Sequence, residues 1–220
     1  MKELNQLLLD FDIKTNFNDY DYFVSASNFF AFSLIDKWPK WEKRILNISG
    51  EKFSGKTHLS NIFKLKSSAL FLNENKLNND IFNKIKLHES IIIDGFSNMV
   101  DENLTYSIFN LIDQDSKYLL ITSEIPLGEM NFKLPDLVSR SRNMLQAKID
   151  PPDDELIFAI ILKNFSDRQI KLEKKIIEFI INRIDRSYSK ISEFIYKIDE
   201  LSLKKKKPIN LKTIKEILKI

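Results

Sequence analysis

Hydrophobic and polar residues divide this chain into two parts with different periods. Up to about residue 150, short apolar runs suited to buried strands alternate with segments whose apolar residues recur at helical spacing. The predicted strands cover 44–49, 69–73, 90–94 and 117–123. The predicted helices begin after Ser27, at 58 and at 102. Strands that alternate with helices indicate an α/β unit with a mostly parallel sheet.

After residue 150 only helical spacing remains. The turn PPDD at 151–154 places prolines early and acids in a first turn, which is typical of a helix start. Apolar residues then recur at a 3.6-residue spacing in ELIFAIILKNF, EKKIIEFIINRI, KISEFIYKIDEL and LKTIKEILK. We therefore expect a flexible tail over 1–15, an α/β core over 16–150 and a small all-helical domain of about four helices over 151–220.

Composition excludes several kinds of site. The 220 residues, 43% hydrophobic and 30% charged, suffice for a packed core. The absence of cysteine rules out disulfides and thiolate metal sites, and two histidines cannot form a histidine-rich one. A net charge of +3 is too small to indicate nucleic acid by itself. We see no signal peptide and no apolar run of the ~20 residues that span a bilayer, so we expect a cytoplasmic protein without membrane contact.

Residues 50–57 read GEKFSGKT and fit the phosphate-loop pattern G-x-x-x-x-G-K-[ST]. A predicted strand precedes this segment and a predicted helix follows it, which is the context that the loop requires. Glycines let backbone N–H groups converge on phosphate oxygens, and the helix N-terminus faces the same anion. Lys56 would supply a cation to the phosphates, and the Thr57 hydroxyl a ligand for Mg²⁺. The expected nucleotide-binding residues of the loop are Gly50, Ser54, Gly55, Lys56 and Thr57.

Two later strand ends add polar groups to this site. Asp94 closes an apolar strand and is the expected carboxylate on the Mg²⁺ side, although an ordinary strand-end aspartate is the alternative. Efficient ATPases commonly carry a second carboxylate at the next position, which here is Gly95. This glycine favours nucleotide binding without efficient turnover. Thr122 ends the following strand and could reach the γ-phosphate region, but a turn-forming role explains it equally well.

The order of these motifs resembles the AAA+ domain of the DnaA family of bacterial replication initiators. The segments that carry the resemblance are, in order, FNDYDYFVSASN, the phosphate loop, IIID, LLITSEIP and LPDLVSR. LPDLVSR, the IDR near 184–186 and the closing IKEILK are more similar still to Hda-like members, short DnaA homologues that inactivate DnaA. The resemblance extends from about residue 17 to the end. It implies an AAA+ core followed by a helical lid, without the DNA-binding domain of DnaA.

Hda-like proteins also carry an N-terminal peptide of the type Q-L-x-L-x-F that binds the sliding clamp of DNA polymerase. Residues 6–11 read QLLLDF and fit this pattern. Two of the apolar side chains suit an apolar pocket, and the amide of the glutamine suits hydrogen bonds at its rim. The alternative is that these residues fold back on the core of the domain. The residues that the resemblance assigns to the clamp are Gln6, Leu7, Leu9 and Phe11.

The resemblance assigns roles to two further positions. The trans-acting arginine of the family stands in LPDLVSR, which makes Arg140 the expected arginine finger, a residue that enters a neighbour's nucleotide site and stabilises phosphoryl transfer. Arg142 competes for the role, and a surface arginine in an exposed turn is the alternative. The nucleotide-contacting lid arginine of the family is replaced by Ser189, with Lys190 or Arg186 as substitutes. This departure favours ADP or ATP, with Mg²⁺, as a mainly structural ligand.

The resemblance implies a negative regulator of replication initiation. Tethered to the clamp on DNA, the AAA+ module would pair with ATP-bound DnaA and promote hydrolysis of its ATP through Arg140. The expected partners are DnaA, the clamp, DNA through the clamp, and a second copy of the chain, in the cytoplasm near the nucleoid. We expect weak or absent ATPase activity of its own. The alternative is an autonomous DnaA-like or helicase-loader-like ATPase at the origin; a small-molecule kinase fits the helical lid poorly.

Overall fold

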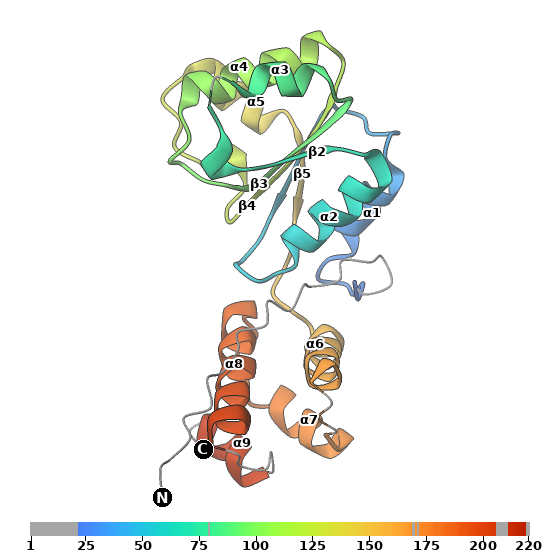
Figure 1. The fold of residues 1–220 in the computed structure, drawn as a ribbon, viewed down its shortest axis with the longest axis vertical. Helices are drawn as coiled ribbons and strands as arrows, with labels where there is room; N and C mark the ends of the chain where they lie inside the picture. The colour runs from blue at the N-terminus through green and yellow to red at the C-terminus, as the bar shows by residue number, and fades with distance from the viewer. Residues whose placement is uncertain (1–21, 79, 169, 171, 206–210, 219–220) are drawn as a thin grey trace, which may run out of the picture.

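The computed structural model describes residues 22–78, 80–168, 170, 172–205 and 211–218. Its centre is a five-stranded parallel sheet in the order β2-β3-β4-β1-β5 (Figure 1). The strands are β1 (Ile45–Ser49), β2 (Leu70–Asn73), β3 (Ser90–Phe96), β4 (Tyr118–Ser123) and β5 (Leu145–Lys148). The α/β class and the parallel sheet that the sequence predicts are confirmed.

Helices cover both faces of this sheet. One face packs against α1 (Phe29–Lys37) and α2 (Lys56–Ser67), and the other against α3 (Ile81–Lys86), α4 (Glu102–Gln114) and α5 (Pro135–Arg142). Along β3, Ile92 packs into the first of these two cores, whereas its neighbours on either side pack into the second. A strand buried on both faces has an uninterrupted apolar sequence, which explains the apolar run of β3.

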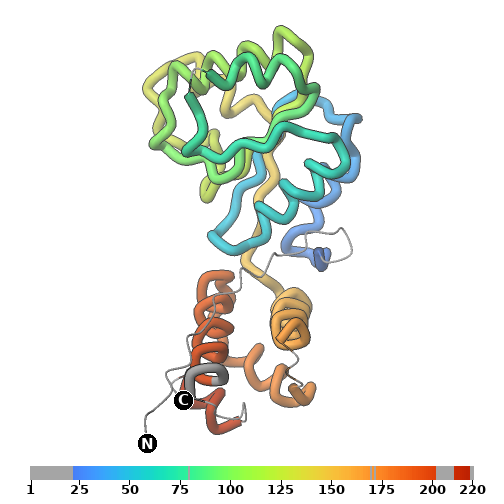
Figure 2. Tube along the Cα trace, in the orientation of Figure 1, coloured from blue at the N-terminus to red at the C-terminus, as the bar shows by residue number. Residues whose placement is uncertain are grey.

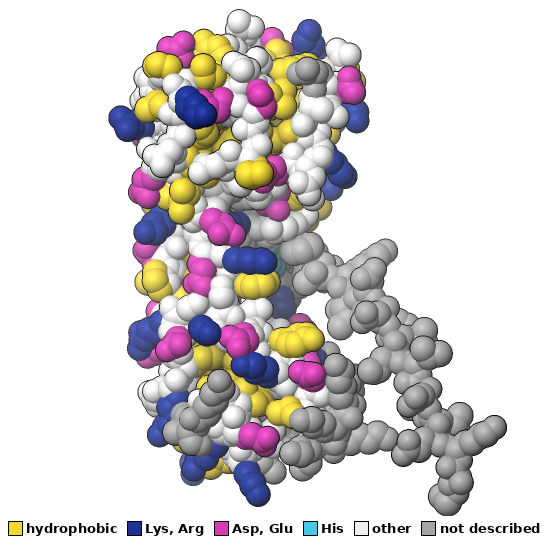
Figure 3. Space-filling view, turned by 90° about the vertical axis from the view of Figure 1, so that its left-hand side faces the viewer, with side chains coloured by type: hydrophobic (Ala, Val, Ile, Leu, Met, Phe, Trp, Pro, Cys, Tyr) yellow, Lys and Arg dark blue, Asp and Glu magenta, His cyan; other side chains and the backbone are white. Residues whose placement is uncertain are grey.

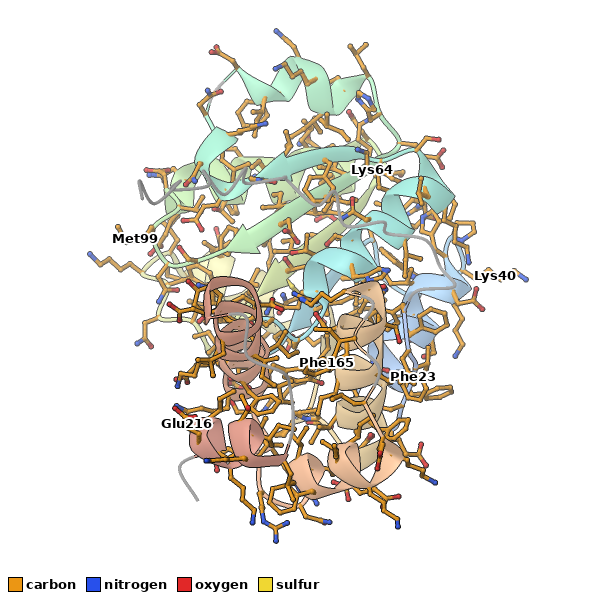
Figure 4. The ribbon with its side chains drawn as sticks, turned by 60° about the horizontal axis from the view of Figure 1, so that its bottom comes forward. Phe23, Lys40, Lys64, Met99, Phe165 and Glu216 are labelled. Carbon is orange, nitrogen blue, oxygen red and sulfur yellow. The ribbon has the colours of Figure 1, made fainter. Side chains whose placement is uncertain are left out.

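The described helices after residue 150 form a separate layer, the lid, beyond one end of the sheet (Figures 1 and 2). They are α6 (Asp154–Asp167), α7 (Lys174–Ile181), α8 (Tyr188–Lys205) and α9 (Leu211–Leu218). The described residues after 150 contain no strand, as the helical spacing predicts. The lid has its own hydrophobic core, in which Phe165 lies between the helices (Figure 4). The lid therefore folds around its own apolar residues and joins the core through the segment before α6.

Three elements escape the hydrophobic pattern. Helix α3 is short, helix α5 begins at a proline, and β5 is a four-residue edge strand with partly exposed polar residues. Short or edge elements bury few side chains and so leave a weak period in the sequence. At the start of α1, Asn28 occupies the N-cap position, and its side-chain amide bonds the backbone of Ser25 and Phe23 instead of the first turn of the helix. Two short 3₁₀ helices cover Glu74–Lys76 and Leu127–Glu129.

Candidate nucleotide site at the carboxyl edge of the sheet

The predicted phosphate loop connects β1 to α2 at the carboxyl edge of the sheet. Gly55 stands at the N-cap of α2 with a φ of +90°, and a Cβ there would lie 3.1 Å from the ring of Tyr22. Only glycine accepts both this backbone conformation and this close approach. The spacing of the motif therefore has a local structural cause, since the helix starts immediately after the left-handed residue.

The Lys56 ammonium lies inside the loop. Its Nζ donates hydrogen bonds to the carbonyl oxygens of Gly50, at 2.6 Å, and Glu51, at 2.8 Å. Burial lowers the pKa of Lys56, and the nearby carboxylates, of which Glu124 acts most strongly, offset that effect only in part. A phosphate oxygen entering the loop would give the ammonium a charged acceptor in place of two neutral ones.

Asp94, at the end of β3, is the centre of a network of hydroxyl groups. Its Oδ2 accepts a hydrogen bond from Thr57 Oγ1 at 2.9 Å. Its Oδ1 accepts from Ser60 Oγ at 3.0 Å and from Thr122 Oγ1 at 2.8 Å. The structure thus brings together Asp94, Thr57 and Thr122 from three separate segments of the sequence. An aspartate and a threonine hydroxyl are hard oxygen donors, so this pair fits the chemistry of an Mg²⁺ ligand set completed by phosphate.

Gly95 follows Asp94 directly and has a left-handed backbone conformation. Its φ is +79°, and the pairing of β3 with β4 shifts register between Ile93 and Phe96. A Cβ at Gly95 would meet nothing within 4 Å, so space is not the obstacle. The obstacle to a carboxylate-bearing residue at this position is the left-handed backbone conformation, which costs free energy for any residue with a side chain.

A cavity of about 770 Å³ opens over the loop. Its lining includes Lys56, Thr57, Asp94, Thr122 and Glu124. Glu124 and Ser60 are functional candidates that the sequence reasoning missed. Both have a signal, because Glu124 directly follows a predicted strand and Ser60 lies one helical turn after Thr57, on the same face of α2.

A second cavity of about 540 Å³ lies between the core and the lid. Its lining includes Tyr22, Ser54 and His58 from the core and Leu156, Ile191 and Tyr196 from the lid. The Tyr22 hydroxyl and Ser54 Oγ are buried and have no hydrogen-bond partner among the described residues. Burial, and then the nearby Tyr188, raise the pKa of Tyr22, so its hydroxyl stays neutral. Buried polar groups normally have partners, and therefore two unpaired hydroxyls fit a site that receives a polar ligand or water.

The loop also contacts the lid directly through Glu51. Its carboxylate accepts hydrogen bonds from Ser187 Oγ at 2.6 Å and from the backbone N–H groups of Tyr188 and Ser189, both at 3.0 Å. Burial by itself raises the pKa of Glu51, but together these hydrogen bonds lower it by more, so the pKa of Glu51 lies below its usual value. The first turn of α8 is therefore capped by an acid from the phosphate loop.

A second junction lies at the segment that joins core and lid. Ser27 Oγ lies 2.9 Å from the carbonyl oxygen of Pro151 and 3.0 Å from Asp153 Oδ2, and it accepts from Asp153 N at 3.0 Å. The other carboxylate oxygen, Asp153 Oδ1, accepts from Leu156 N at 2.8 Å and caps α6. The entrance to the lid is thus attached to the segment before α1, independently of the loop.

The structure does not bring Lys190 to the phosphate loop. Its ammonium lies 3.2 Å from Glu193 on the same helix, and it lines neither cavity described above. Arg186, the other substitute for the lid arginine, forms an exposed ion pair with Asp154 at 3.0 Å.

Arg140 lies in the last turn of α5, at the opposite edge of the sheet from the loop. Its Nη1 is 2.6 Å from Asp113 Oδ2, and its guanidinium carbon is 5.5 Å from the ring centre of Tyr106. The shallow cavity beside it is lined by Ile45, the first residue of β1, which places Arg140 at the amino edge. Arg142 is exposed and makes no side-chain hydrogen bond or ion pair with described residues. Arg140 therefore lies in a helix, whereas the alternative expected it in an exposed turn.

The four predicted clamp-binding residues lie outside the described part of the chain. Within that part, no helix is long and apolar enough to cross a membrane. The same residues contain no cluster of three or more histidine, cysteine or acidic side chains that could hold a metal ion. Acidic and basic side chains are interspersed over core and lid on the face shown in Figure 3.

Comparison with known proteins supports the motif reading. The family model of the Hda lid domain matches residues 153–218. The replication initiator DnaA of Nautilia profundicola is 27% identical over 208 residues, which cover 82% of this chain and 47% of that protein. The chain thus spans about half the length of this relative.

Two solved structures share the fold. Domain III of Thermotoga maritima DnaA superposes with a TM-score of 0.73 at 20% identity, covering 92% of this chain and 95% of that one. The AMPPCP-bound DnaA of Aquifex aeolicus gives a TM-score of 0.64 at 16% identity, covering 84% of this chain and 66% of that one. The end of the chain is therefore similar to the Hda lid domain, and the chain as a whole is similar to DnaA in sequence and shares the fold of its domain III.

Proposed function

We propose that this protein binds an adenine nucleotide at the phosphate loop and promotes hydrolysis of ATP on a DnaA protein through Arg140, as a negative regulator of replication initiation. The observation that carries the proposal is the position of Arg140. It lies at the amino edge of the sheet, while the loop lies at the carboxyl edge. An arginine so placed can serve a nucleotide only on another molecule.

The first part of the proposal rests on the hydroxyl and carboxylate network around the loop. Lys56 and the backbone of the loop would hold the phosphates, and Thr122 lies within reach of the last of them. Thr57 and Asp94 would hold Mg²⁺ together with phosphate oxygens. The second cavity adjoins the loop at Gly55 and has room for a base and ribose. DnaA structures with AMPPCP share this fold and support an adenine nucleotide as the ligand.

Little turnover by the protein itself follows from the same site. Gly95 supplies no carboxylate to orient water, and Lys190 lies beside Glu193. A nucleotide that stays bound would stabilise the folded state by mass action, whether it is ADP or ATP. The lid's own apolar cluster supports the division of the chain into a core over 16–150 and a lid over 151–220, and Leu156 and Tyr188 of the lid pack into the core.

Arg140 is held in a way that permits exchange of its partner. The ion pair with Asp113 is partly exposed, with side-chain exposures of 34% and 50%, and such pairs contribute only about 0–1 kcal/mol. A phosphate on a neighbouring subunit would offer the guanidinium a stronger bidentate acceptor. Trans arginines of this kind accelerate phosphoryl transfer by ~10³–10⁵-fold. A second copy of this chain that covers Arg140 would be a resting form of the same contact.

The clamp tether belongs to the same proposal. Residues 6–11 would hold the protein on the clamp near newly replicated DNA, so that a weak AAA+ contact with DnaA suffices. DNA is then an indirect partner, and the protein is cytoplasmic and close to the nucleoid. Gln6→Ala combined with Phe11→Ala should abolish capture by purified clamp, and equal capture of the double variant would remove the tether from the account.

The experiment that tests the proposal is ATP hydrolysis by DnaA in the presence of clamp loaded on DNA. Wild type should stimulate hydrolysis, Arg140→Ala should abolish the stimulation, and Arg142→Ala should preserve it. Arg142 is the matched control because it is exposed on the same helix, two residues away. Loss of stimulation in Arg142→Ala with retention in Arg140→Ala would reverse the assignment.

An autonomous ATPase is the second candidate, and Glu124 is the observation that favours it. This carboxylate lines the cavity over the loop and acts on the pKa of Lys56. It could take the place of the acid that Gly95 lacks. Steady ATP turnover by the purified protein alone, abolished by Lys56→Ala and by Glu124→Gln, would support this candidate.

A further inference from the structure

Glu51 contacts both the phosphate loop and the first turn of α8 in the lid. Its backbone carbonyl oxygen accepts a hydrogen bond from Lys56 Nζ at 2.8 Å, inside the loop. Its carboxylate accepts three hydrogen bonds from the start of α8 in the lid. Glu51 therefore links the ammonium of Lys56, which would bind phosphate, to helix α8 of the lid.

The Glu51 carboxylate adds to the local cap of α8, in which Ser187 Oγ accepts a hydrogen bond from Lys190 N at 3.4 Å. The first amides of a helix have no partner within the helix, and a negative charge there is favoured by the helix dipole. The backbone amides of Tyr188 and Ser189 find their acceptor in Glu51, which lies 137 and 138 positions away in the sequence. The orientation of α8 consequently depends on the conformation of the phosphate loop.

The other junction makes this dependence matter. Ser27, Pro151 and Asp153 attach the start of the lid to the core without any group of the loop. Tyr188 adds a hydroxyl bond to the Asp150 carbonyl oxygen at 3.0 Å, beside the same joining segment. The lid thus has one attachment to the core that involves no residue of the loop. Its other attachment is made by Glu51, which belongs to the loop.

We propose that Glu51 is a positioning residue that transmits phosphate occupancy of the loop to the first turn of α8, so that phosphate alone orders the lid. The proposal rests on nucleotide binding at the loop and adds how that binding regulates the lid. When phosphate draws Lys56 away from the carbonyl oxygens, the loop settles around the anion. Glu51 is then fixed, and the amides that it caps open less often.

Hydrogen exchange of the full chain tests this, with Mg²⁺ and inorganic pyrophosphate as the probe because pyrophosphate carries no base. In wild type, pyrophosphate should slow hydrogen exchange of the amides in the loop and in the first turn of α8 by roughly threefold to tenfold, the factor that one typical hydrogen bond contributes. In Glu51→Gln the loop should still respond and α8 should not. Ser187→Ala, which removes one donor, should give an intermediate response of α8.

The matched control is Glu193→Gln, which removes an acid of α8 that pairs only with lysines of its own helix. This variant should keep the wild-type response. An α8 response in Glu51→Gln equal to that of wild type would overturn the proposal. No protection of the loop by pyrophosphate in wild type would overturn nucleotide binding at the loop as well, which separates the two failures.

Discussion

The two edges of the sheet differ in whether their functional groups have partners within the chain. At the carboxyl edge, Lys56 bonds loop carbonyl oxygens, and Asp94 bonds hydroxyls from a helix and a neighbouring strand. At the amino edge, Arg140 has a single partly exposed carboxylate and a shallow cavity beside it. Under the proposed function, the first edge would hold a nucleotide by itself, whereas the second would act on a nucleotide of another molecule.

Among changes to the protein's own ligand binding and stability, the largest effect is expected at the carboxyl edge of the sheet. Lys56→Ala removes the ammonium that faces the loop and its two hydrogen bonds. We expect ADP affinity to fall by roughly 10- to 100-fold, since one hydrogen bond between the charged ammonium and a phosphate contributes about 1.5–3 kcal/mol. Isothermal titration with Mg²⁺ and ADP measures this. Lys52→Ala is the control, because the Lys52 ammonium lines the same cavity but lies 5.2 Å from the centre of the Phe53 ring instead of bonding loop carbonyl oxygens. An equal loss in both variants would contradict a special role for Lys56.

The next effect concerns the missing carboxylate. Gly95→Glu should destabilise the protein by about 1–3 kcal/mol, because the new residue must adopt a positive φ. It should also fail to create efficient ATP turnover. Denaturant unfolding and a steady-state assay check both statements. Gly95→Asn is the comparison, since asparagine tolerates the left-handed region better, and a Glu variant as stable as wild type would show that the backbone relaxes there.

A smaller effect sharpens the amino edge. Asp113→Asn removes the charge that holds Arg140 and should change the free energy of unfolding by less than about 1 kcal/mol, because the pair is partly exposed. Stimulation of DnaA should persist, since the arginine remains. A stimulation lost in Asp113→Asn as fully as in Arg140→Ala would mean that the carboxylate has to orient the finger.

The smallest effect is a dependence on pH at the junctions between core and lid. For both Glu51 and Asp153, burial raises the pKa but hydrogen bonds lower it more, and the folded-state pKa lies below the ordinary value. Their contribution to stability is therefore present above the unfolded pKa and is lost as pH falls through the folded one. The difference in melting temperature between wild type and Glu51→Gln should be present at pH 6 and shrink below about pH 4. A difference that grows on acidification would contradict the sign.

The phosphate loop, the buried strands and the lid helices could be predicted because each is encoded in contiguous residues. GEKFSGKT contains both the turn and the start of the helix, and uninterrupted apolar runs predict the buried strands. The Hda-like order of motifs extended this to the AAA+ fold, which the shared fold with DnaA confirms.

The rest depends on contacts between distant segments, which no local period encodes. The capping of α8 by Glu51 joins residues 136 positions apart, and the Arg140–Asp113 pair joins two helices. The resemblance offered Lys190 or Arg186 as a substitute for the nucleotide-contacting arginine of the lid, but the ammonium of Lys190 pairs with Glu193 and the guanidinium of Arg186 with Asp154. The assignment of roles to Lys190 and Arg140 stays a prediction.

The central claim is that Arg140 acts on the transition state of a reaction in another molecule. The most direct test is single-turnover hydrolysis of ATP on DnaA, measured against increasing concentrations of this protein with clamp on DNA. The account predicts that Arg140→Ala lowers the maximal rate by ~10³-fold or more while the half-saturating concentration changes little. An unchanged maximal rate, with only the half-saturating concentration shifted, would show that Arg140 serves binding and would contradict the account.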